Sequence, residues 1–328
     1  MDENLTSTER LPVHIDTDDL SPMTMRVSLL QIKILNALAF IITVAINGIS
    51  AAGVLSPYKV GDVSRMHPTK IVPAGGAFSI WSVIYTIETI FILYSLFCWP
   101  NSENDVLHHG IGFWFASGCL FNSLWIVTFV QGNTESLWCS TVLIYCLLFS
   151  LCKMYLGAEC WVKRRTGGSI QSFVLTLLLD VHLSMYCGWV TVATIVATSA
   201  TLTSTGWKGE PFNESAWSVI MLCVALLINS YIVIQREDCV WGFVLAWASA
   251  WIAVKNGGDT AVVVGSLLVC SLISIVSIVI TVRVMLGCWR SKDNIHIIDH
   301  NIDLDDHMAD SNGRDAKGGF ESARVPEI

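Results

Sequence analysis

The chain has 328 residues, of which 53% are hydrophobic and only 14% are charged. A soluble domain carries about 25% charged residues, so this composition excludes an ordinary soluble protein. Residues 1–29 and 290–328 hold 15 of the 27 acidic residues, which leaves the middle of the chain strongly apolar. The net charge of −8 and the lack of a basic stripe disfavour nucleic-acid binding. The middle of the chain is therefore predicted to lie in a lipid bilayer.

Eight apolar stretches of suitable length predict eight membrane-spanning helices, because about 20 residues cross the hydrocarbon core. They are 30–53, 77–98, 111–131, 136–156, 173–201, 215–235, 239–254 and 260–286. The fifth is long, with Gly188 near its centre, and is expected to form one tilted or bent helix. The seventh is short and is expected either to lie deep among its neighbours or to bring polar flanks to the interface. The predicted fold is an all-α polytopic membrane protein.

The basic residues predict the orientation of the helices, because Lys and Arg near the membrane are enriched on the cytoplasmic side. With eight crossings, both termini share a side. That side collects Arg26, Lys33, Lys153, Lys163, Arg164, Arg165, Arg236, Arg283, Arg290 and Lys292, against Lys59, Arg65, Lys70, Lys208 and Lys255 opposite. Both termini are therefore predicted to be cytoplasmic. The glycosylation sequon that begins at Asn213 falls on the other side, in agreement with this orientation.

The two flanking segments, 1–29 and 290–328, are acidic and polar, and both are predicted to be disordered. The first shows no basic stretch followed by an apolar one, so the first membrane helix is expected to direct insertion. The second contains His296, His300, Asp303 and His307, which would share one face only if that segment became helical. No metal site is predicted from them. Cys288 is a candidate for palmitoylation or a free thiol without a role.

Three aromatic clusters lie inside or at the ends of predicted membrane helices, although Trp usually prefers the membrane interfaces. The first runs from Val72 to Tyr85, where Pro73, Gly75 and Gly76 predict a closely packed start to the second helix. The other two lie in the third and fifth helices. Each tryptophan alone is consistent with helix packing, but together they predict an aromatic-lined pocket. The residues expected to form it are Pro73, Phe78, Trp81, Tyr85, Asn122, Trp125, Trp189 and Thr194.

These clusters resemble the tryptophan-rich sensory protein and translocator protein family. The family's second helix opens with Pro, an aromatic residue and Trp-x-x-x-Tyr, which Pro73, Phe78, Trp81 and Tyr85 match; its third carries Asn-x-x-Trp, and its fifth Trp followed by Ala-Thr. The resemblance covers residues 30–202. It implies a five-helix bundle that binds porphyrins, sterols or drug-like molecules in a pocket beneath the loop after the first helix, here 54–76.

Two departures limit what the resemblance implies. The family usually has Asn three positions after the Ala-Thr, where this chain has Ala197, so one polar group is missing from the expected pocket. Residues 203–289 are expected to form three additional helices that five-helix members lack. The resemblance therefore does not identify the ligand.

Two ionisable residues at similar depth, Glu88 in the second helix and His182 in the fifth, suggest a second kind of chemistry. Ionisable groups inside a membrane are costly and often functional. The resemblance implies that these two helices are neighbours, so Glu88 and His182 are predicted to meet and to relay a proton. The alternative is that each is satisfied separately within the bundle.

The leading hypothesis is an integral membrane protein that binds a hydrophobic, planar small molecule as sensor, carrier or scavenger. A proton-coupled transporter that uses Glu88 and His182 is the first alternative, and a membrane scaffold is the second. The expected partners are the lipid bilayer and the hydrophobic ligand, with a porphyrin or haem as a candidate and a homodimer left open. No cofactor, metal site or catalytic residue is predicted, and an enzymatic role is disfavoured.

Overall fold

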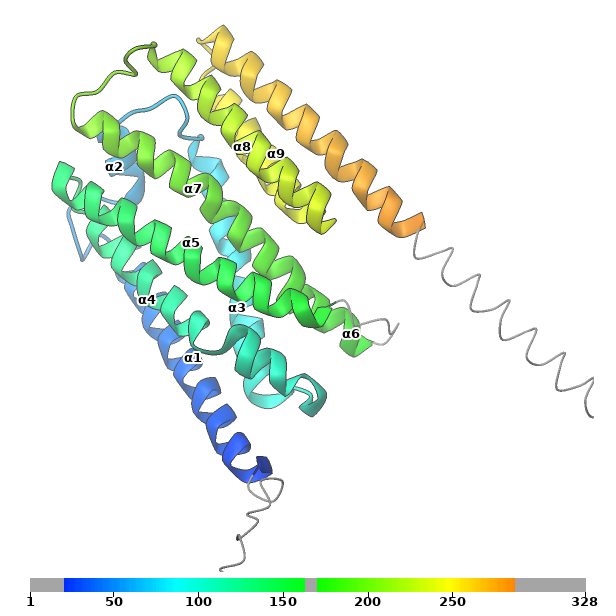
Figure 1. The fold of residues 1–328 in the computed structure, drawn as a ribbon. Helices are drawn as coiled ribbons and strands as arrows, with labels where there is room; N and C mark the ends of the chain where they lie inside the picture. Colours follow the sequence, from blue (N-terminus) through cyan, green and yellow to red (C-terminus); the bar gives the residue numbers. More distant parts are fainter. Residues whose placement is uncertain (1–20, 163–169, 287–328) are drawn as a thin grey trace, which may run out of the picture.

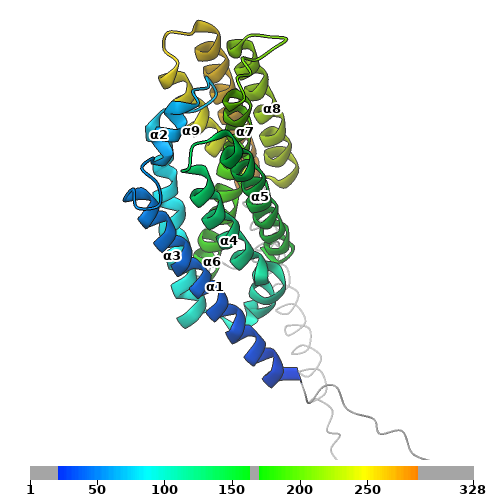
Figure 2. The same ribbon diagram turned by 90° about the vertical axis from the view of Figure 1, so that its left-hand side faces the viewer.

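The computed structural model describes residues 21–162 and 170–286, and those residues form helices and connecting turns without a β-strand. The expectations for residues 1–20, for 290–328 with its histidines, and for Cys288 lie outside the described residues. Figures 1 and 2 show an elongated bundle of long helices that run along one another.

The helices follow the predicted apolar stretches closely. In chain order they are α1 (Ser21–Ala51), α2 (Val60–Met66), η1 (Gly75–Ser79), α3 (Ile80–Phe97), η2 (Asn101–Glu103), η3 (Val106–Ile111), α4 (Gly112–Phe129), α5 (Thr134–Val162), α6 (Ile170–Leu175), η4 (Thr176–Val181), α7 (His182–Ser204), α8 (Glu214–Arg236), α9 (Cys239–Lys255) and a last helix, Thr260–Leu286. Within the described residues, seven spans are long and apolar enough to cross a membrane, and α9 is a shorter apolar helix. The prediction of an all-α polytopic membrane protein is confirmed, with seven helices of spanning length and α9 as the shorter apolar helix at the predicted seventh position.

Two helix starts differ from the predicted ones. α1 begins at Ser21, so the end of the segment 1–29 that was expected to be disordered is helical. Pro22 lies in the first turn, where the missing N–H costs no hydrogen bond, and no further Pro or Gly interrupts the chain before the apolar stretch. The third membrane span begins at Asn101, ahead of the predicted residue 111. Within this span Gly112 adopts a φ of 44°, a conformation that favours glycine, where η3 meets α4.

The fifth membrane span is one continuous helical segment, Ile170–Ser204, as expected, but its irregularity is not at Gly188. A π-helical turn, η4, separates α6 from α7 and changes the rotation per residue just before His182. Gly188 instead marks a close helix contact, because a Cβ atom there would touch the side chain of Val244 on α9.

The helices pack as a series in which α7 is central. α4 packs between α1 and α5, α5 packs on α7, and α7 contacts both α3 and α9. The second and fifth membrane helices, α3 and α7, are thus neighbours, as the family resemblance implied. α8 packs on α9, and the last helix reaches α9 where Ser277 faces Gly242. The short helix α9 therefore lies deep among its neighbours and joins the first five spans to the rest.

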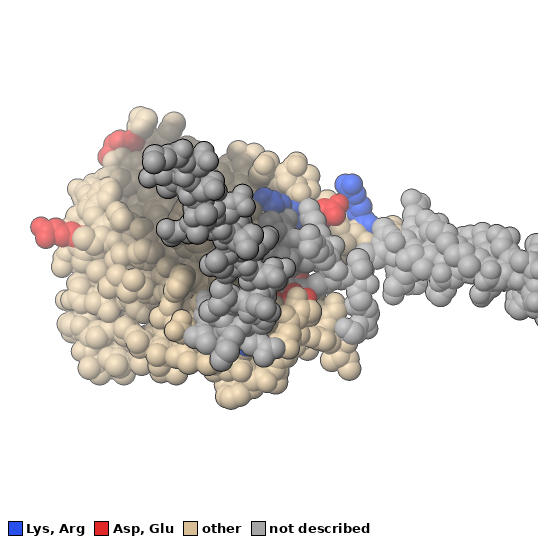
Figure 3. Space-filling model, turned by 60° about the horizontal axis from the view of Figure 1, so that its bottom comes forward, with Lys and Arg blue, Asp and Glu red and all other residues tan. Residues whose placement is uncertain are grey.

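The outer surface of the bundle is apolar. Large side chains that point away from the core include Leu38, Ile41, Phe97, Val142, Phe149, Leu227, Leu268 and Val279. Figure 3 shows a broad uncharged flank on which Lys, Arg, Asp and Glu are few. Such a surface is unfavourable in water and matches the acyl chains of a bilayer.

The first described turns of α1 and the end of the last helix lie toward the same end of the bundle in Figure 1. The loop after α1, with α2, lies at the opposite end. The fold itself does not say which end faces the cytoplasm, so the cytoplasmic placement of the termini stays a prediction.

We expect epitope tags at the two termini to become accessible together and on the cytoplasmic side, because eight crossings return the chain to its starting side. Selective permeabilisation of cells with antibody staining measures this directly. A cysteine in place of Asn213 provides the control, since an impermeant maleimide should reach it only from the opposite side. Tags in different compartments would contradict the eight-span topology.

An aromatic cavity as the candidate functional site

The candidate site is built around Trp81 in the first turn of α3. Its indole stacks with Tyr85 at 5.6 Å and with Trp125 at 6.2 Å between ring centroids. It meets Tyr186 and Trp189 edge to face, at 5.7 and 6.3 Å. Offset-stacked and edge-to-face pairs are the favourable geometries of aromatic rings. α3, α4 and α7 are therefore joined through one side chain.

A buried amide, that of Asn122 on α4, supports the aromatic cluster. Its Oδ1 accepts hydrogen bonds from Asn47 Nδ2 at 2.9 Å and from the Tyr85 hydroxyl at 3.2 Å. Its Nδ2 donates to the Tyr186 hydroxyl at 3.1 Å. Asn122 is 0% exposed, so these partners replace the water that it lacks. One amide thus links four membrane helices, α1, α3, α4 and α7.

A cavity of about 60 Å³ lies beside this cluster, between the helices and the loop 54–76, which we call the cap. The cap contributes Val60, Val63, Ser64, His67, Val72 and Pro73 to the lining, and the helices contribute Phe78, Trp81, Trp125, Phe129, Leu137, Ile144, Trp189, Val192, Ala193, Val196, Ala197 and Ala200. The lining is almost wholly apolar, with His67 and Ser64 on the cap side. Such a surface favours an apolar ligand.

Short-range contacts give the cap its shape. The Asp62 carboxylate accepts a hydrogen bond from the Lys59 N–H at 2.8 Å and pairs with Arg65, which stabilises the first turn of α2. The imidazole Nε2 of His67 lies 2.8 Å from the carbonyl oxygen of Gly132, in the turn between α4 and α5. The cap is therefore fixed to the first five spans on the side of α4.

The structure brings most of the predicted pocket residues together. Pro73, Phe78, Trp81, Trp125 and Trp189 line the cavity, and Phe78 meets Trp189 edge to face at 5.9 Å. Tyr85 and Asn122 lie beside the cavity and hold Trp81 and its neighbours rather than lining it. Thr194 is buried but does not line the cavity. Its hydroxyl donates to the carbonyl of Thr191 at 2.7 Å, the usual partner of a threonine inside a helix.

Two further positions singled out in the sequence, Ala197 and Gly76, have clear roles in the structure. Ala197 lines the cavity, so the wall is apolar where the family pattern has an amide. Gly76 packs against α9, because a Cβ atom there would overlap the indole of Trp251. Gly75, by contrast, has open space beside it, so only one of the two glycines is needed for close packing.

The predicted pair of Glu88 and His182 is not formed. Among the described residues, no hydrogen bond or ion pair joins the two side chains. Glu88 lies within electrostatic range of Tyr85 and Tyr186, whereas His182 packs on Tyr186 at 6.1 Å and lines a small void with Phe91 and other apolar side chains. The prediction of similar depth for Glu88 and His182 assumed a regular α-helix before His182. The π-turn η4 changes both the depth of His182 and the direction in which its side chain faces. The proton relay of the transporter alternative therefore lacks its central contact.

Several site residues were missed from the sequence alone. Tyr186 lies three residues before Trp189, and this helical spacing could have placed both on one face. The cap residues Val63 and His67 belong to no motif, and Val72 was not assigned to the pocket although it begins the first aromatic cluster; no local signal shows that these side chains turn inward. Their positions depend on how the cap folds back over α4 and α7.

Two indole nitrogens beside the cavity are left without partners. The Nε1 atoms of Trp125 and Trp189 are buried, and neither has a hydrogen-bond acceptor among the described residues. An unpaired buried N–H costs free energy, about 1–3 kcal/mol in proteins. A ligand with acceptor oxygens would lower this cost only where widening of the cavity exposes these buried atoms.

A second cavity, of about 260 Å³, lies toward the other end of the bundle, between α5, α7 and the turn before α9. Its carboxylate Asp238 accepts hydrogen bonds from the hydroxyls of Tyr155 at 2.8 Å and Ser184 at 2.5 Å, and from the Val240 N–H at 3.1 Å. Burial raises the pKa of Asp238 despite these donors. Since Asp238 caps α9 and is well satisfied by its neighbours, we interpret it as a structural group.

Replacing Asn122 by alanine should lower the stability of the bundle by about 1–3 kcal/mol, because Asn47 and Tyr85 would lose their buried acceptor. Unfolding of the detergent-solubilised protein, followed by circular dichroism, measures this change. Asn101→Ala is the matched control, because Asn101 is exposed at the start of its span and should change little. Equal stability of Asn122→Ala and the wild type would show that the network contributes no net stabilisation.

Comparison with known proteins gives one match. A family model described as TSPO-like protein matches residues 33–281, which is 249 of the 328 residues. The matched segment includes the membrane spans beyond residue 202, so the three additional helices belong to the match. No curated protein and no solved structure matches the chain.

Proposed function

Because the chain belongs to the TSPO-like protein family, we propose that its aromatic cavity binds a hydrophobic, planar small molecule from the membrane. The observation that carries this proposal is the cluster of four rings around Trp81 at the wall of an apolar cavity. Flat aromatic walls offer large apolar contact area and suit stacking on a planar ligand. The role is that of a sensor, carrier or scavenger.

The lining also suggests the chemistry of the ligand. The apolar wall favours a large hydrocarbon or macrocyclic body, and Ala197 adds no polar requirement to it. The unpaired Nε1 atoms of Trp125 and Trp189 favour a ligand that presents acceptor oxygens at its edge. A porphyrin, with a flat ring and two carboxylates, meets both conditions. A sterol meets the first but offers a single hydroxyl.

The cavity in this conformation is smaller than such a ligand. Pockets for drug-sized molecules measure about 300–1,000 Å³, against about 60 Å³ here. Binding of a porphyrin therefore requires the cavity to widen. Every other described residue of the lining belongs to a membrane span, so we expect the cap to move outward.

Trp81→Ala and Trp189→Ala should each weaken binding of protoporphyrin IX by about 1–3 kcal/mol, or five- to 150-fold in Kd, since each removes a large aromatic contact. Titration of the purified protein in nanodiscs, followed by the Soret absorbance, gives Kd. Trp138→Ala is the matched control, because Trp138 is 48% exposed on the outer face of α5. An unchanged Kd in both variants, or no binding by the wild type, would contradict the proposal. Selective binding of cholesterol would show that the ligand is a sterol and not a porphyrin.

Ala197→Leu should block the same ligand by filling the cavity from the α7 wall. The added carbon atoms occupy space that the wild type leaves empty, so the melting temperature should stay equal or rise. We expect Kd for protoporphyrin IX to increase at least about tenfold, which corresponds to 1.4 kcal/mol. Ala51→Leu, at the exposed end of α1, is the control. Wild-type affinity for protoporphyrin IX in a folded Ala197→Leu protein would show that the ligand does not bind in this cavity.

A further inference from the structure

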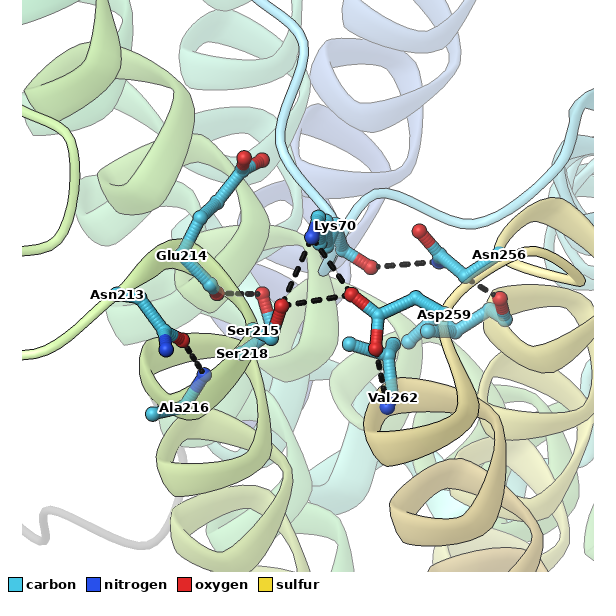
Figure 4. Close-up of polar contacts among 10 residues, drawn as sticks. Lys70, Asn213, Glu214, Ser215, Ala216, Ser218, Asn256, Asp259 and Val262 are labelled. Carbon is cyan, nitrogen blue, oxygen red and sulfur yellow. Dashed lines mark hydrogen bonds and ion pairs between the residues drawn. The ribbon is translucent and has the colours of Figure 1, made fainter.

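The cap is held on its other side by the C-terminal helices, through Lys70. The Lys70 ammonium donates to Asp259 Oδ2 at 2.6 Å, just before the last helix, and to Ser215 Oγ at 2.8 Å, in the first turn of α8. The Ser215 hydroxyl donates to the same Asp259 oxygen at 2.6 Å. Figure 4 shows the three side chains converging from three separate segments of the chain. We call these three residues the latch.

The cap backbone beside the latch is bound to the turn after α9. Asn256 Nδ2 donates to the Lys70 carbonyl at 2.8 Å, and Lys255 Nζ lies 3.4 Å from the Thr69 carbonyl. The Thr69 carbonyl also accepts a long hydrogen bond from the Val72 N–H, at 3.4 Å. The side-chain donors from Lys255 and Asn256 complete the pairing of loop carbonyls that would otherwise need water. The backbone carbonyls of Thr69 and Lys70 are thus both bound by side chains from the end of α9 and the residue after it.

A second set of contacts joins the start of α3 to α9. Trp247 Nε1 donates to the Ala77 carbonyl at 3.1 Å, and the Ala74 N–H donates to the Trp251 carbonyl at 3.1 Å. Gly76 lies directly against the Trp251 indole, with no room for a Cβ atom. The segment from 69 to 77 is therefore held at both of its ends by α9 and the residue that follows it.

Electrostatics favour the latch near neutral pH. The Lys70 ammonium, the Ser215 hydroxyl and the Val262 N–H hold the pKa of Asp259 well below its usual range. A depressed carboxyl pKa contributes stability that is present above the ordinary value near 4 and is lost as the pH falls below it. Asp259 is therefore ionised at neutral pH. The side chains of Lys70 and Asp259 are 32% and 21% exposed to solvent. The ion pair of the latch is thus partly shielded from water, which strengthens it relative to a fully exposed pair.

The latch is placed to control the cavity. Val72 and Pro73, which line the cavity, follow Lys70 by two and three residues. Lys70, Asn256 and Trp251 hold this segment, so we expect outward movement of the cap to require that these contacts break. The cavity is too small for a large ligand in this conformation. We propose that α8, α9 and the last helix form a gate, in which the latch holds the cap closed and sets the rate of ligand exchange. The effect on ligand rests on the proposed function, whereas the closed cap does not.

Hydrogen–deuterium exchange of the full-length protein in nanodiscs tests the latch without a ligand. Lys70→Met removes the charge and keeps the alkyl chain; Asp259→Asn removes the charge and keeps a side-chain oxygen to cap the last helix. Both should speed exchange of the amides in residues 69–77 by roughly three- to tenfold, since local opening becomes easier. Gly76→Ala, which wedges the cap from Trp251, should act in the same direction.

Arg65→Met is the matched control for this experiment. Arg65 is a cap cation whose ion pair, with Asp62, stays within α2, and its side chain is 75% exposed. Exchange in 69–77 should remain at the wild-type rate in this variant. Unchanged exchange in Lys70→Met and Asp259→Asn, or an equal increase in Arg65→Met, would overturn the latch.

Stopped-flow kinetics with protoporphyrin IX test the gate. Lys70→Met and Asp259→Asn should raise the association and dissociation rates together, about three- to tenfold, with a smaller change in Kd, because both directions pass through the open cap. Wild-type rates in both variants, with binding intact, would overturn control of exchange. Failure of the wild type to bind porphyrin would overturn the proposed function, while the exchange measurement decides the latch separately.

Discussion

A helical bundle in lipid has to satisfy its polar groups internally, and this constraint organises the site. Asn122 is completely enclosed, and its three hydrogen bonds fix the positions of α1, α3 and α7 around α4. Tyr85 and Tyr186, which bond to this amide, are also the rings that pack on Trp81. The geometry of the aromatic cluster therefore depends on a polar contact beneath it.

The cap poses the same problem at one end of the bundle, where a loop must find partners for its polar groups. On one side His67 reaches the turn after α4, as expected for a loop over a five-helix bundle. On the other side the partners are Ser215, Asn256 and Asp259, all from the segment beyond residue 202. The three additional helices are thus not a separate appendage, because part of the site's cover rests on them. The family match to residue 281 agrees with this integration.

The sequence predicted the helices well and the site in part. The apolar lengths located every membrane span, and the motif around Trp81 located the cluster, because both signals are local. The failures share a cause. Glu88 and His182 were paired on the assumption that both helices are regular. The π-turn at Thr176–Val181 breaks this assumption, and no local sequence signal predicted it. Thr194 was assigned to the pocket by its motif, although its hydroxyl bonds within its own helix.

Composition and periodicity by themselves determined that this chain is an all-α membrane protein with aromatic residues inside it, since burial in lipid demands long apolar runs. They did not determine which rings meet, because facing directions depend on helix rotation and on the partners of groups such as Asn122. They also gave no sign that Lys70 contacts Asp259, 189 residues away. Only the tertiary structure brings such distant residues together, because a contact between a loop and the residue before a distant helix leaves no periodic signal in either segment.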